Sequence, residues 1–363
     1  MERIWWEQIT NANRFIDLIV SGILEGKSSV LCLHKLTPWR NTMRELVENR
    51  VLKDSNARSF ELIGSPESSI GEFMLNKYCK EEKRLEYRPS KSYAQFLAES
   101  DDIVLNSRIV WVQNISSKKL GEWVDFVSEY HLSMKSDMSP AVFILEADED
   151  LVGKITKKGV RTIVYTKEMN YFDTYAFCIL AASGVSGQDY LKNYWAELLS
   201  SVCAIDIELS AKCMGHAQKF LENPYEVLCD IAESETRSDG EPFSFSLDKD
   251  YVAKKIWKTQ IKIIFPVIED YREEFVNKYR EQIMTLLPIK NSQGEDLNEP
   301  EEIEIGTLYH IASKCKLVVD SNTHNELYRL KTARNTLAHL ELLNLEIVKD
   351  VLGKAKFIQD GWY

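Results

Sequence analysis

Residues 29–39 read SVLCLHKLTPW, an apolar run followed by a loop without glycine. The apolar part, Ser29–Leu33, predicts a buried strand. Thr37 followed by Pro38 is typical of a helix N-cap with proline at the first helical position, so we expect a helix to begin there. Strand, loop and helix in this order are the units from which α/β domains are built.

The same alternation continues through the first 165 residues. Four further short runs rich in β-branched or aromatic residues are Phe60–Ile63, Ile109–Val112, Ala141–Leu145 and Thr162–Tyr165. Helical patterns lie between them, most clearly at Leu120–Tyr130, whose apolar residues recur at helical spacing. We therefore predict an α/β domain with a sheet of about five strands, mostly parallel and covered on both faces.

Beyond about residue 185 the sequence has no convincing strand. Residues 187–235 have a helical pattern, and a polar, turn-forming stretch, SETRSDGEP, follows at 234–242. A second polar loop, PIKNSQGEDLNEP at 288–300, precedes the last helices. We predict three parts: an α/β domain over residues 1–185, a helical lid or linker region over 186–240, and an all-helical domain over 241–363.

The composition is that of a globular protein, with 44% hydrophobic and 28% charged residues. There is no basic N-terminal segment with an apolar core, so we expect no signal peptide. No apolar run approaches the roughly 20 residues of a membrane span. The net charge of −11 disfavours stable binding to duplex DNA, although local basic clusters such as Arg329, Lys331 and Arg334 are present. We expect a cytoplasmic protein without membrane contact.

The seven cysteines are widely spaced and never occur as Cys-x-x-Cys. This pattern is typical of reduced, mostly buried thiols in a cytosol and speaks against a zinc site. Five histidines are isolated in the same way: His34, His131, His216, His310 and His324. We predict no metal site and no other cofactor.

The α/β domain lacks a phosphate-binding loop. Residues Gly22–Ser28, GILEGKS, are one residue shorter than such a loop, and they precede a strand, whereas a phosphate-binding loop follows a strand and opens a helix. The loop that does follow the first strand, His34–Trp39, contains no glycine to bring backbone amides around a phosphate.

A carboxylate for Mg²⁺ is also missing where it is expected. The run Ile109–Val112 continues as Gln113-Asn114, without an acid. Glu146, Asp148 and Glu149 follow the next strand, and we interpret them as a solvated loop. We predict no nucleotide-binding residues and no ATPase activity.

The arrangement nevertheless resembles the core of STAND or AAA-type ATPases over about residues 15–230. A strand and loop are followed by a helix, a later strand precedes the aromatic helix at Trp123–Phe126, and an all-helical lid comes next. With both nucleotide motifs missing, the resemblance implies a degenerate, inactive ATPase-like module. Such a module can serve as a scaffold or an oligomerisation surface.

The C-terminal part contains the motif Arg334-Asn335-Thr336-Leu337-Ala338-His339. At about 100° per residue, a helix separates its residues into two sides. The polar side carries Arg334, Asn335 and His339, and the apolar side carries Leu330, Ala333, Leu337 and Leu340. A guanidinium and an imidazole then flank a shallow gap above Ala338 that admits a phosphodiester. We expect this helix to run on toward Ile347–Leu352.

These two side chains suit RNA cleavage without a metal. The 2′-hydroxyl must lose a proton, the phosphorane must be stabilised, and the 5′-oxygen must gain a proton. Histidine is the residue type best suited to proton transfer near neutral pH, so His339 is the candidate for the proton transfers. Arg334 is always charged and can contact two phosphorane oxygens at once.

The motif is similar to the HEPN ribonuclease signature, and the resemblance covers roughly residues 250–355. It implies a metal-independent endoribonuclease that leaves 2′,3′-cyclic phosphate ends, with Arg334, His339 and Asn335 at the site. It also implies a homodimer in which two motifs face each other. HEPN ribonucleases commonly act as effectors of bacterial toxin and antiphage systems, so the resemblance implies control by the ATPase-like module or by a protein partner.

The alternative is a non-catalytic adaptor or scaffold subunit of a multi-protein defence complex. HEPN domains without activity carry the same kind of helix, and Arg334 would then pair with an acid such as Glu304 or Glu326. Glu269 is a further candidate to supply a carboxylate to Arg334.

Overall fold

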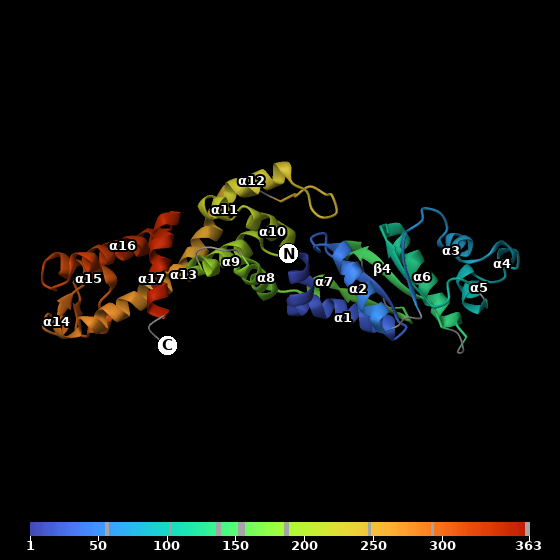
Figure 1. Ribbon diagram of the computed structural model, residues 1–363, viewed down its shortest axis with the longest axis horizontal. Coiled ribbons are helices and arrows are strands. Elements are labelled where there is room, and N and C mark those ends of the chain that lie inside the picture. Colours follow the sequence, from blue (N-terminus) through green and yellow to red (C-terminus); the bar gives the residue numbers. More distant parts are fainter. Residues whose placement is uncertain are drawn as a thin grey trace. The chain divides into compact units, whose positions relative to one another are not determined.

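The computed structural model describes residues 1–54, 58–101, 103–135, 139–151, 157–184, 189–245, 248–291 and 294–359 (Figure 1). The chain divides into two compact units. The first contains Met1–Phe177 together with Ile205–Glu208, and the second contains Cys178–Ala204 together with Leu209–Tyr363. The sequence predicts three parts, with boundaries at residues 185 and 240, and these boundaries stay predictions. Residue 185 lies outside the described residues.

A sheet of five parallel strands forms the centre of the first unit. The strands are β1 (Ser28–Leu33), β2 (Ser59–Gly64), β3 (Arg108–Gln113), β4 (Val142–Asp148) and β5 (Val160–Val164), in the order β2-β3-β4-β1-β5. Val30 of β1 lies opposite Leu145 of β4 and Thr162 of β5. Every residue of β1 is buried, because helices cover both faces of the sheet, whereas only Ile63 is buried in the edge strand β2. The predicted five-stranded α/β domain is confirmed.

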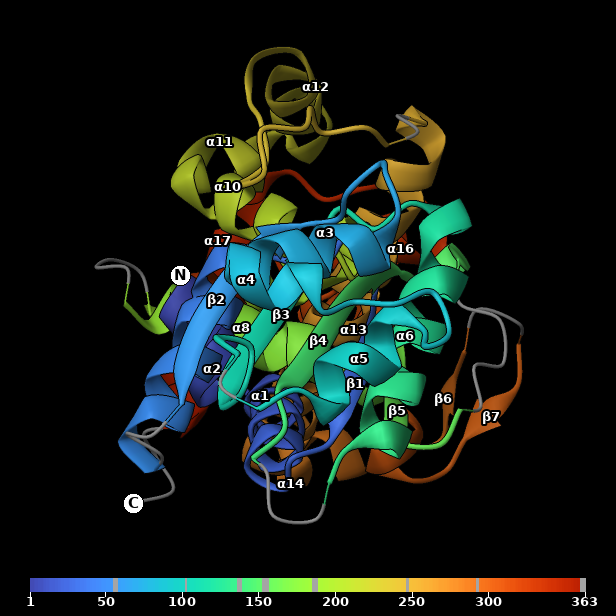
Figure 2. The same cartoon turned by 90° about the vertical axis from the view of Figure 1, so that its right-hand side faces the viewer.

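Helices cover the sheet on its two faces (Figure 2). On one face lie α3 (Ile70–Tyr78), α5 (Tyr93–Glu99) and α6 (Ser117–Ser133). Leu97 of α5 and Trp123 of α6 share a core there with Phe143 of β4. Two other helices, α1 (Thr10–Leu24) and α2 (Arg40–Asp54), pack against each other, and α1 contacts β1. The shorter helical segments are η1 (Ile4–Gln8), α4 (Glu81–Leu85), η2 (Glu149–Leu151) and α7 (Tyr165–Glu168).

The second unit is built around α13 (Lys249–Lys278), which contacts α9 (Asp189–Cys203), α16 (Ser321–Ala338) and α17 (Leu345–Gln359). Ile264, Ile268 and Phe275 of α13 are buried. The other helices of this unit are α11 (Ala217–Glu222), α12 (Pro224–Ser234), α14 (Arg280–Met284), η3 (Pro300–Glu302) and α15 (Ile305–Ser313). Two helices have residues in both units: α8 (Tyr171–Ser183) and α10 (Ile207–Gly215).

The prediction of no strand beyond residue 185 is wrong in one detail. The polar loop at 288–300 contains a short antiparallel pair, β6 (Ile289–Lys290) and β7 (Asp296–Leu297). Gly294, with a φ of 85°, lies in the turn between them and takes this left-handed conformation without steric cost. The unit is otherwise helical, as predicted. No helix in the described part of the chain has the length and apolarity needed to cross a membrane.

The His131 imidazole is partly buried at the end of α6, beside Ser28 of β1. Ser28 Oγ lies 2.6 Å from His131 Nε2 and accepts a hydrogen bond from the N–H of Phe143 at 2.8 Å. Burial lowers the pKa of His131 to about 4, so the ring is neutral near pH 7. In the unfolded chain its pKa returns to about 6.5, and the unfolded chain therefore takes up the proton first as the pH falls. We expect the first unit to lose stability as the pH falls from about 6.5 to about 4.

Urea denaturation across that pH range measures this effect. His131→Gln removes the titrating group and is expected to flatten the pH dependence of the unfolding midpoint. His310→Gln, at an exposed position of α15, is the matched control and should leave the dependence unchanged. A wild-type midpoint that shifts no more with pH than that of His131→Gln contradicts the prediction.

Candidate functional site

The carboxyl ends of the parallel strands meet at one edge of the sheet, where open α/β sheets bind their ligands. In the strand order, β4 and β1 are neighbours, with β2 toward one edge of the sheet and β5 at the other. The chain therefore leaves β1 toward one edge, to reach β2, and leaves β4 toward the opposite edge, to reach β5. A ligand crevice forms where neighbouring strands lead in opposite directions. The loop after β1 and the last residues of β4 therefore border the candidate nucleotide site.

The loop after β1 leads to a helix whose N-terminus already faces a carboxylate. α2 begins at Arg40, and the backbone N–H of Trp39 donates to Glu208 Oε1 at 2.7 Å. Glu208 is buried and belongs to the first unit. Free N–H groups and the dipole of a helix N-terminus attract anions, and nucleotide sites use them to bind phosphate. The protein's own Glu208 carboxylate takes that position here.

The predicted start of this helix at Thr37-Pro38 is wrong. Trp39 has a φ of 44°, in the left-handed region, so a right-handed helix cannot continue through it. The Thr37 hydroxyl, which the sequence suggests as the cap, is buried and has no hydrogen-bond partner in the described part of the chain. Glu208, 169 residues away in sequence, supplies the capping oxygen instead.

Glu146 lies at the centre of a buried polar cluster near the end of β4. Arg44 donates to it twice, from Nε to Oε2 at 3.0 Å and from Nη2 to Oε1 at 2.9 Å. Trp111 Nε1 donates to Oε2 at 2.9 Å. The interpretation of Glu146 as part of a solvated loop is therefore wrong, because β4 extends to Asp148 and keeps Glu146 inside the sheet.

The chemistry of this edge does not favour a nucleotide–metal site. Both carboxylate oxygens of Glu146 are engaged, and Glu149 accepts a hydrogen bond from the Thr166 hydroxyl. No group of three His, Cys, Asp or Glu side chains that could hold a metal ion occurs among the described residues. In the described part of the chain, the loop without glycine and the carboxylate at the helix N-terminus disfavour binding of a phosphate at this position.

We expect the protein to release no phosphate from ATP above background. Glu208→Ala should not create the activity, because removing the carboxylate restores neither a glycine-rich loop nor a carboxylate for Mg²⁺. A phosphate-release assay on both proteins measures this. Hydrolysis that is lost when the loop His34–Trp39 is mutated would refute the degenerate interpretation.

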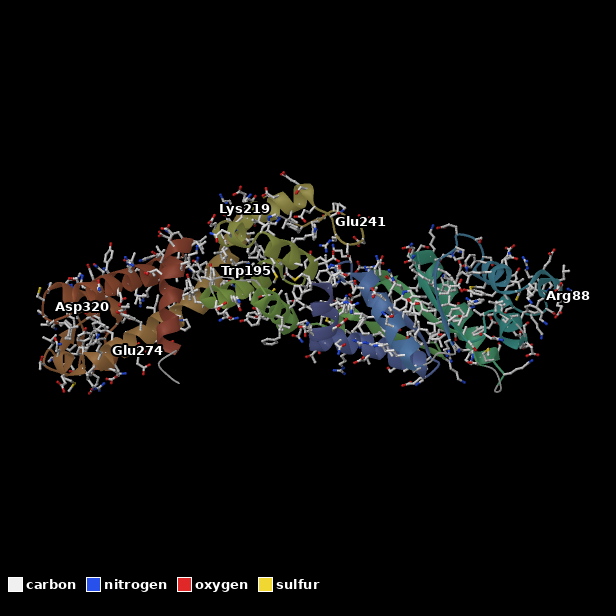
Figure 3. The ribbon with its side chains drawn as sticks, viewed as in Figure 1. Arg88, Trp195, Lys219, Glu241, Glu274 and Asp320 are labelled. Atoms are coloured by element: carbon white, nitrogen blue, oxygen red, sulfur yellow. The ribbon has the colours of Figure 1, made fainter. Side chains whose placement is uncertain are left out.

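In the second unit, α16 carries the predicted motif at its C-terminal end. The helix starts after Asp320, labelled in Figure 3, whose carboxylate accepts a hydrogen bond from the Thr323 N–H at 2.9 Å. Three residues of the predicted apolar side are buried: Leu330, Ala333 and Leu337. Trp257 of α13 donates its Nε1–H to the carbonyl of Leu337 at 2.9 Å and holds the last turn of the helix in place.

α16 ends immediately before His339. Leu340 follows with a φ of 64°, and its N–H donates to the Leu337 carbonyl at 3.2 Å. The N–H of Glu341 donates to the Thr336 carbonyl at 3.1 Å. These two hydrogen bonds are those of a Schellman motif, which ends a helix.

The prediction that the helix runs on to Ile347–Leu352 is therefore wrong. Those residues belong to α17, a separate helix. Leu340, expected on the buried side, is 71% exposed, because the left-handed residue turns the chain out of the helical path.

The motif side chains lie at the surface of the second unit. Arg334 is 33% exposed and its Nη2 lies 3.1 Å from Glu304 Oε2, in an ion pair with an exposed acid. Asn335 is partly exposed and His339 is exposed. Within the described ranges, no hydrogen bond holds the His339 imidazole. An exposed ion pair contributes little stability, so a phosphate can compete for Arg334.

Of the three predicted acids, Glu304 pairs with Arg334, and the other two have other partners in the described part of the chain. Glu269 pairs with Arg272, at 2.6 Å between Oε2 and Nε. Glu326 accepts a hydrogen bond from the Tyr271 hydroxyl at 2.8 Å.

Sequence reasoning missed the aromatic residues near this motif. Tyr309 of α15 contacts both His324 and Tyr328 of α16, and Lys331 lies over its ring. The signal was available on α16, since His324, Tyr328 and Lys331 recur at intervals of four and three residues and so share one helix face.

No protein-family model matches the chain, and no curated protein matches it. Among solved structures, it is similar to one described as the structure of the Aeropyrum pernix ORC2 protein in ADPNP–ADP complexes. The two share 11% identity over 95% of this chain and 93% of that chain, with a TM-score of 0.29. The helices and strands of the chain define its fold class: an α/β domain with a five-stranded parallel sheet, followed by a mostly helical region.

Proposed function

We propose that the second unit is a metal-independent endoribonuclease of HEPN type, with Arg334 and His339 as catalytic residues. The observation that carries the proposal is that both side chains are accessible at one end of α16, while the opposite side of the helix is buried. A phosphodiester can therefore reach the guanidinium and the imidazole from solvent. Asn335, between them in sequence, has a positioning role.

The reaction needs only groups that the chain and RNA supply. A base removes the 2′-hydroxyl proton, the 2′-oxygen bonds to phosphorus, and the bond from phosphorus to the 5′-oxygen breaks as that oxygen gains a proton. Arg334 stabilises the charge on the phosphorane. Incubation of the purified chain with labelled RNA in EDTA tests the proposal. Fragments with 2′,3′-cyclic phosphate ends support it, and intact RNA counts against it.

We expect the active form to be a homodimer, because one motif supplies one imidazole while the reaction has a proton to remove and a proton to add. Exposed apolar side chains next to His339 favour an interface there: Leu340 and Leu342 are both exposed. Light scattering on purified protein should give twice the mass of one chain. Leu340→Glu should reduce it to that of a monomer and reduce cleavage with it. A monomer that cleaves RNA contradicts this expectation.

The first unit is proposed to regulate the ribonuclease, alone or with a protein partner. Its candidate nucleotide site is filled by Glu208 and by the Glu146 cluster, which suits a scaffold better than an ATPase. The resemblance to HEPN effectors suggests a role in bacterial toxin or antiphage defence. The same site, occupied by the protein's own side chains, also favours the alternative of a non-catalytic adaptor. If the protein is an adaptor, it should assemble normally and cleave no RNA under any condition.

A further inference from the structure

One face formed by α15 and α16 carries a cluster of aromatic rings. The centroids of Tyr309 and Tyr328 lie 5.6 Å apart, and those of Tyr309 and His324 lie 5.2 Å apart. Tyr328 is 52% exposed although it is a large side chain in a helical bundle. An exposed ring fixed by its neighbours is a platform on which a nucleic-acid base can stack at a small cost in entropy.

Positive charge accompanies these rings. Lys331 Nζ lies 4.6 Å from the centroid of the Tyr309 ring, and no carboxylate pairs with it in the described part of the chain. Lys314 and Lys316, in the connection between α15 and α16, are exposed. Two acids nearby in sequence have local partners and keep their negative charge: Asp320 caps α16 and Glu326 accepts from Tyr271. Lys331, with Lys314 and Lys316 in the adjoining connection, provides ammonium groups that can bind phosphate on a chain whose net charge is −11.

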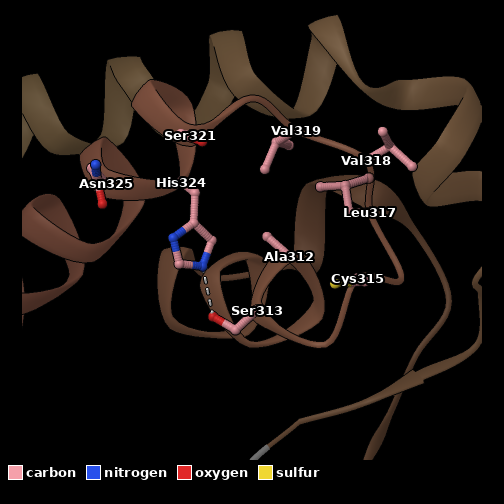
Figure 4. A pocket seen from close by; sticks show the side chains of 9 residues that line it. All are labelled: Ala312, Ser313, Cys315, Leu317, Val318, Val319, Ser321, His324 and Asn325. Atoms are coloured by element: carbon pink, nitrogen blue, oxygen red, sulfur yellow. Dashed lines mark hydrogen bonds between the residues drawn. The ribbon is translucent and has the colours of Figure 1, made fainter.

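A groove of about 440 Å³ adjoins the cluster at the start of α16 (Figure 4). His324 lines it together with the apolar side chains of Leu317 and Val318. Ser313 Oγ donates to the Tyr309 carbonyl at 2.8 Å and lies 3.0 Å from His324 Nε2. This contact with Ser313 holds the His324 imidazole in the wall of the groove.

The spacing on α16 aligns these residues with the ribonuclease motif. His324, Tyr328, Lys331 and Asn335 differ by four, three and four residues, so they follow one stripe along the helix. At 1.5 Å per residue, the stripe from His324 to His339 is about 22 Å long. A flexible single strand can follow such a stripe, whereas a duplex hides its bases from the rings.

We propose that this stripe, made of His324, Tyr328, Lys331 and Asn335 with Tyr309 beside it, binds single-stranded RNA and leads it to Arg334 and His339. Tyr328 stacks on a base, and Lys331 contacts the phosphate backbone. The groove beside His324 takes a second, unstacked base. That the RNA is led to Arg334 and His339 rests on the proposed ribonuclease function. The binding of RNA by the stripe does not rest on it.

Fluorescence anisotropy with labelled oligo(U) tests the binding, using the full chain with His339→Ala so that the RNA stays intact. Tyr328→Ala should weaken binding by about 5- to 150-fold, which corresponds to the loss of one base–aromatic stack. Tyr328→Phe should keep the affinity. Lys331→Gln should weaken binding and lower the slope of log affinity against log salt by about 0.7.

The chain offers a matched control on α13. Tyr251 is 51% exposed, and Lys255 Nζ lies 5.2 Å from its ring centroid. Tyr251→Ala removes the same kind of pair from a helix without the motif and should leave oligo(U) binding unchanged. An RNA duplex should bind more weakly than oligo(U).

The outcomes separate this inference from the proposed function. RNA cleavage that depends on His339, with binding and KM unaffected by Tyr328→Ala, overturns the stripe and leaves the ribonuclease standing. Binding that depends on Tyr328 without any cleavage supports the stripe and removes the ribonuclease. Equal loss in Tyr251→Ala, equal binding of the duplex, or no binding of oligo(U) overturns the stripe; in the last case the rings serve a protein partner.

Discussion

Replacing His339 with alanine is expected to reduce the rate of RNA cleavage by about 10²–10⁴-fold, the usual effect of removing one general acid–base group. His339 is exposed at the end of α16 and is not part of a core, so its loss should leave the fold intact. The measurement is the cleavage rate of labelled RNA in EDTA, with circular dichroism to verify that the variant is folded. DNA lacks the 2′-hydroxyl that attacks phosphorus and should stay intact.

Two further substitutions separate the roles of the motif residues. Arg334→Lys should also lose most activity, because a compact ammonium cannot contact two phosphorane oxygens. Asn335→Ala should retain more activity, since an amide side chain neither transfers the proton nor carries a charge that stabilises the phosphorane. Glu304→Gln frees Arg334 from its ion pair, and we expect it to cleave at least as fast as wild type. Cleavage that persists in His339→Ala, or intact RNA in every condition, would contradict the ribonuclease proposal and favour the non-catalytic adaptor.

The sheet could be predicted from the sequence because its signals are local. An apolar run such as Ser29–Leu33 is short, bounded and followed by a helical pattern, so each run identifies its own strand. Parallel pairing follows from the helices between the strands. The apolar side of α16 could be predicted for the same reason, since helical spacing alone places Ala333 and Leu337 in the core.

The filled site at the edge of the sheet could not be predicted, because its partners are far apart in sequence. Arg44 and Glu146 are 102 residues apart, and Trp39 and Glu208 are 169 residues apart. No local pattern distinguishes an acid that contacts an arginine from one that contacts water.

The end of α16 was missed for a different reason. A left-handed residue at a helix C-terminus is usually glycine, and here it is Leu340.

The largest expected effect on stability comes from Glu146→Ala. Glu146 is buried and binds Arg44 through both oxygens, while Arg40 Nη1 lies 3.6 Å from Oε1 and the Trp111 indole donates to Oε2. Removing the carboxylate leaves the largely buried Arg44 guanidinium without its counter-charge. Such a loss costs about 3–5 kcal/mol, a large part of the roughly 5–15 kcal/mol that stabilises a domain. Urea denaturation should show a much lower midpoint for the first unit.

The control is Asp148→Ala, at the end of the same strand. Asp148 is 63% exposed and lies 4.0 Å from Arg40, so its loss should change the free energy of unfolding by less than about 1 kcal/mol. The pair can also be removed together: Glu146→Leu with Arg44→Met leaves no unpaired charge and should recover most of the stability lost in Glu146→Ala, since apolar replacements of a buried ion pair are often neutral. If Glu146→Ala and Asp148→Ala unfold at the same midpoint, Glu146 is not the buried anchor of Arg44.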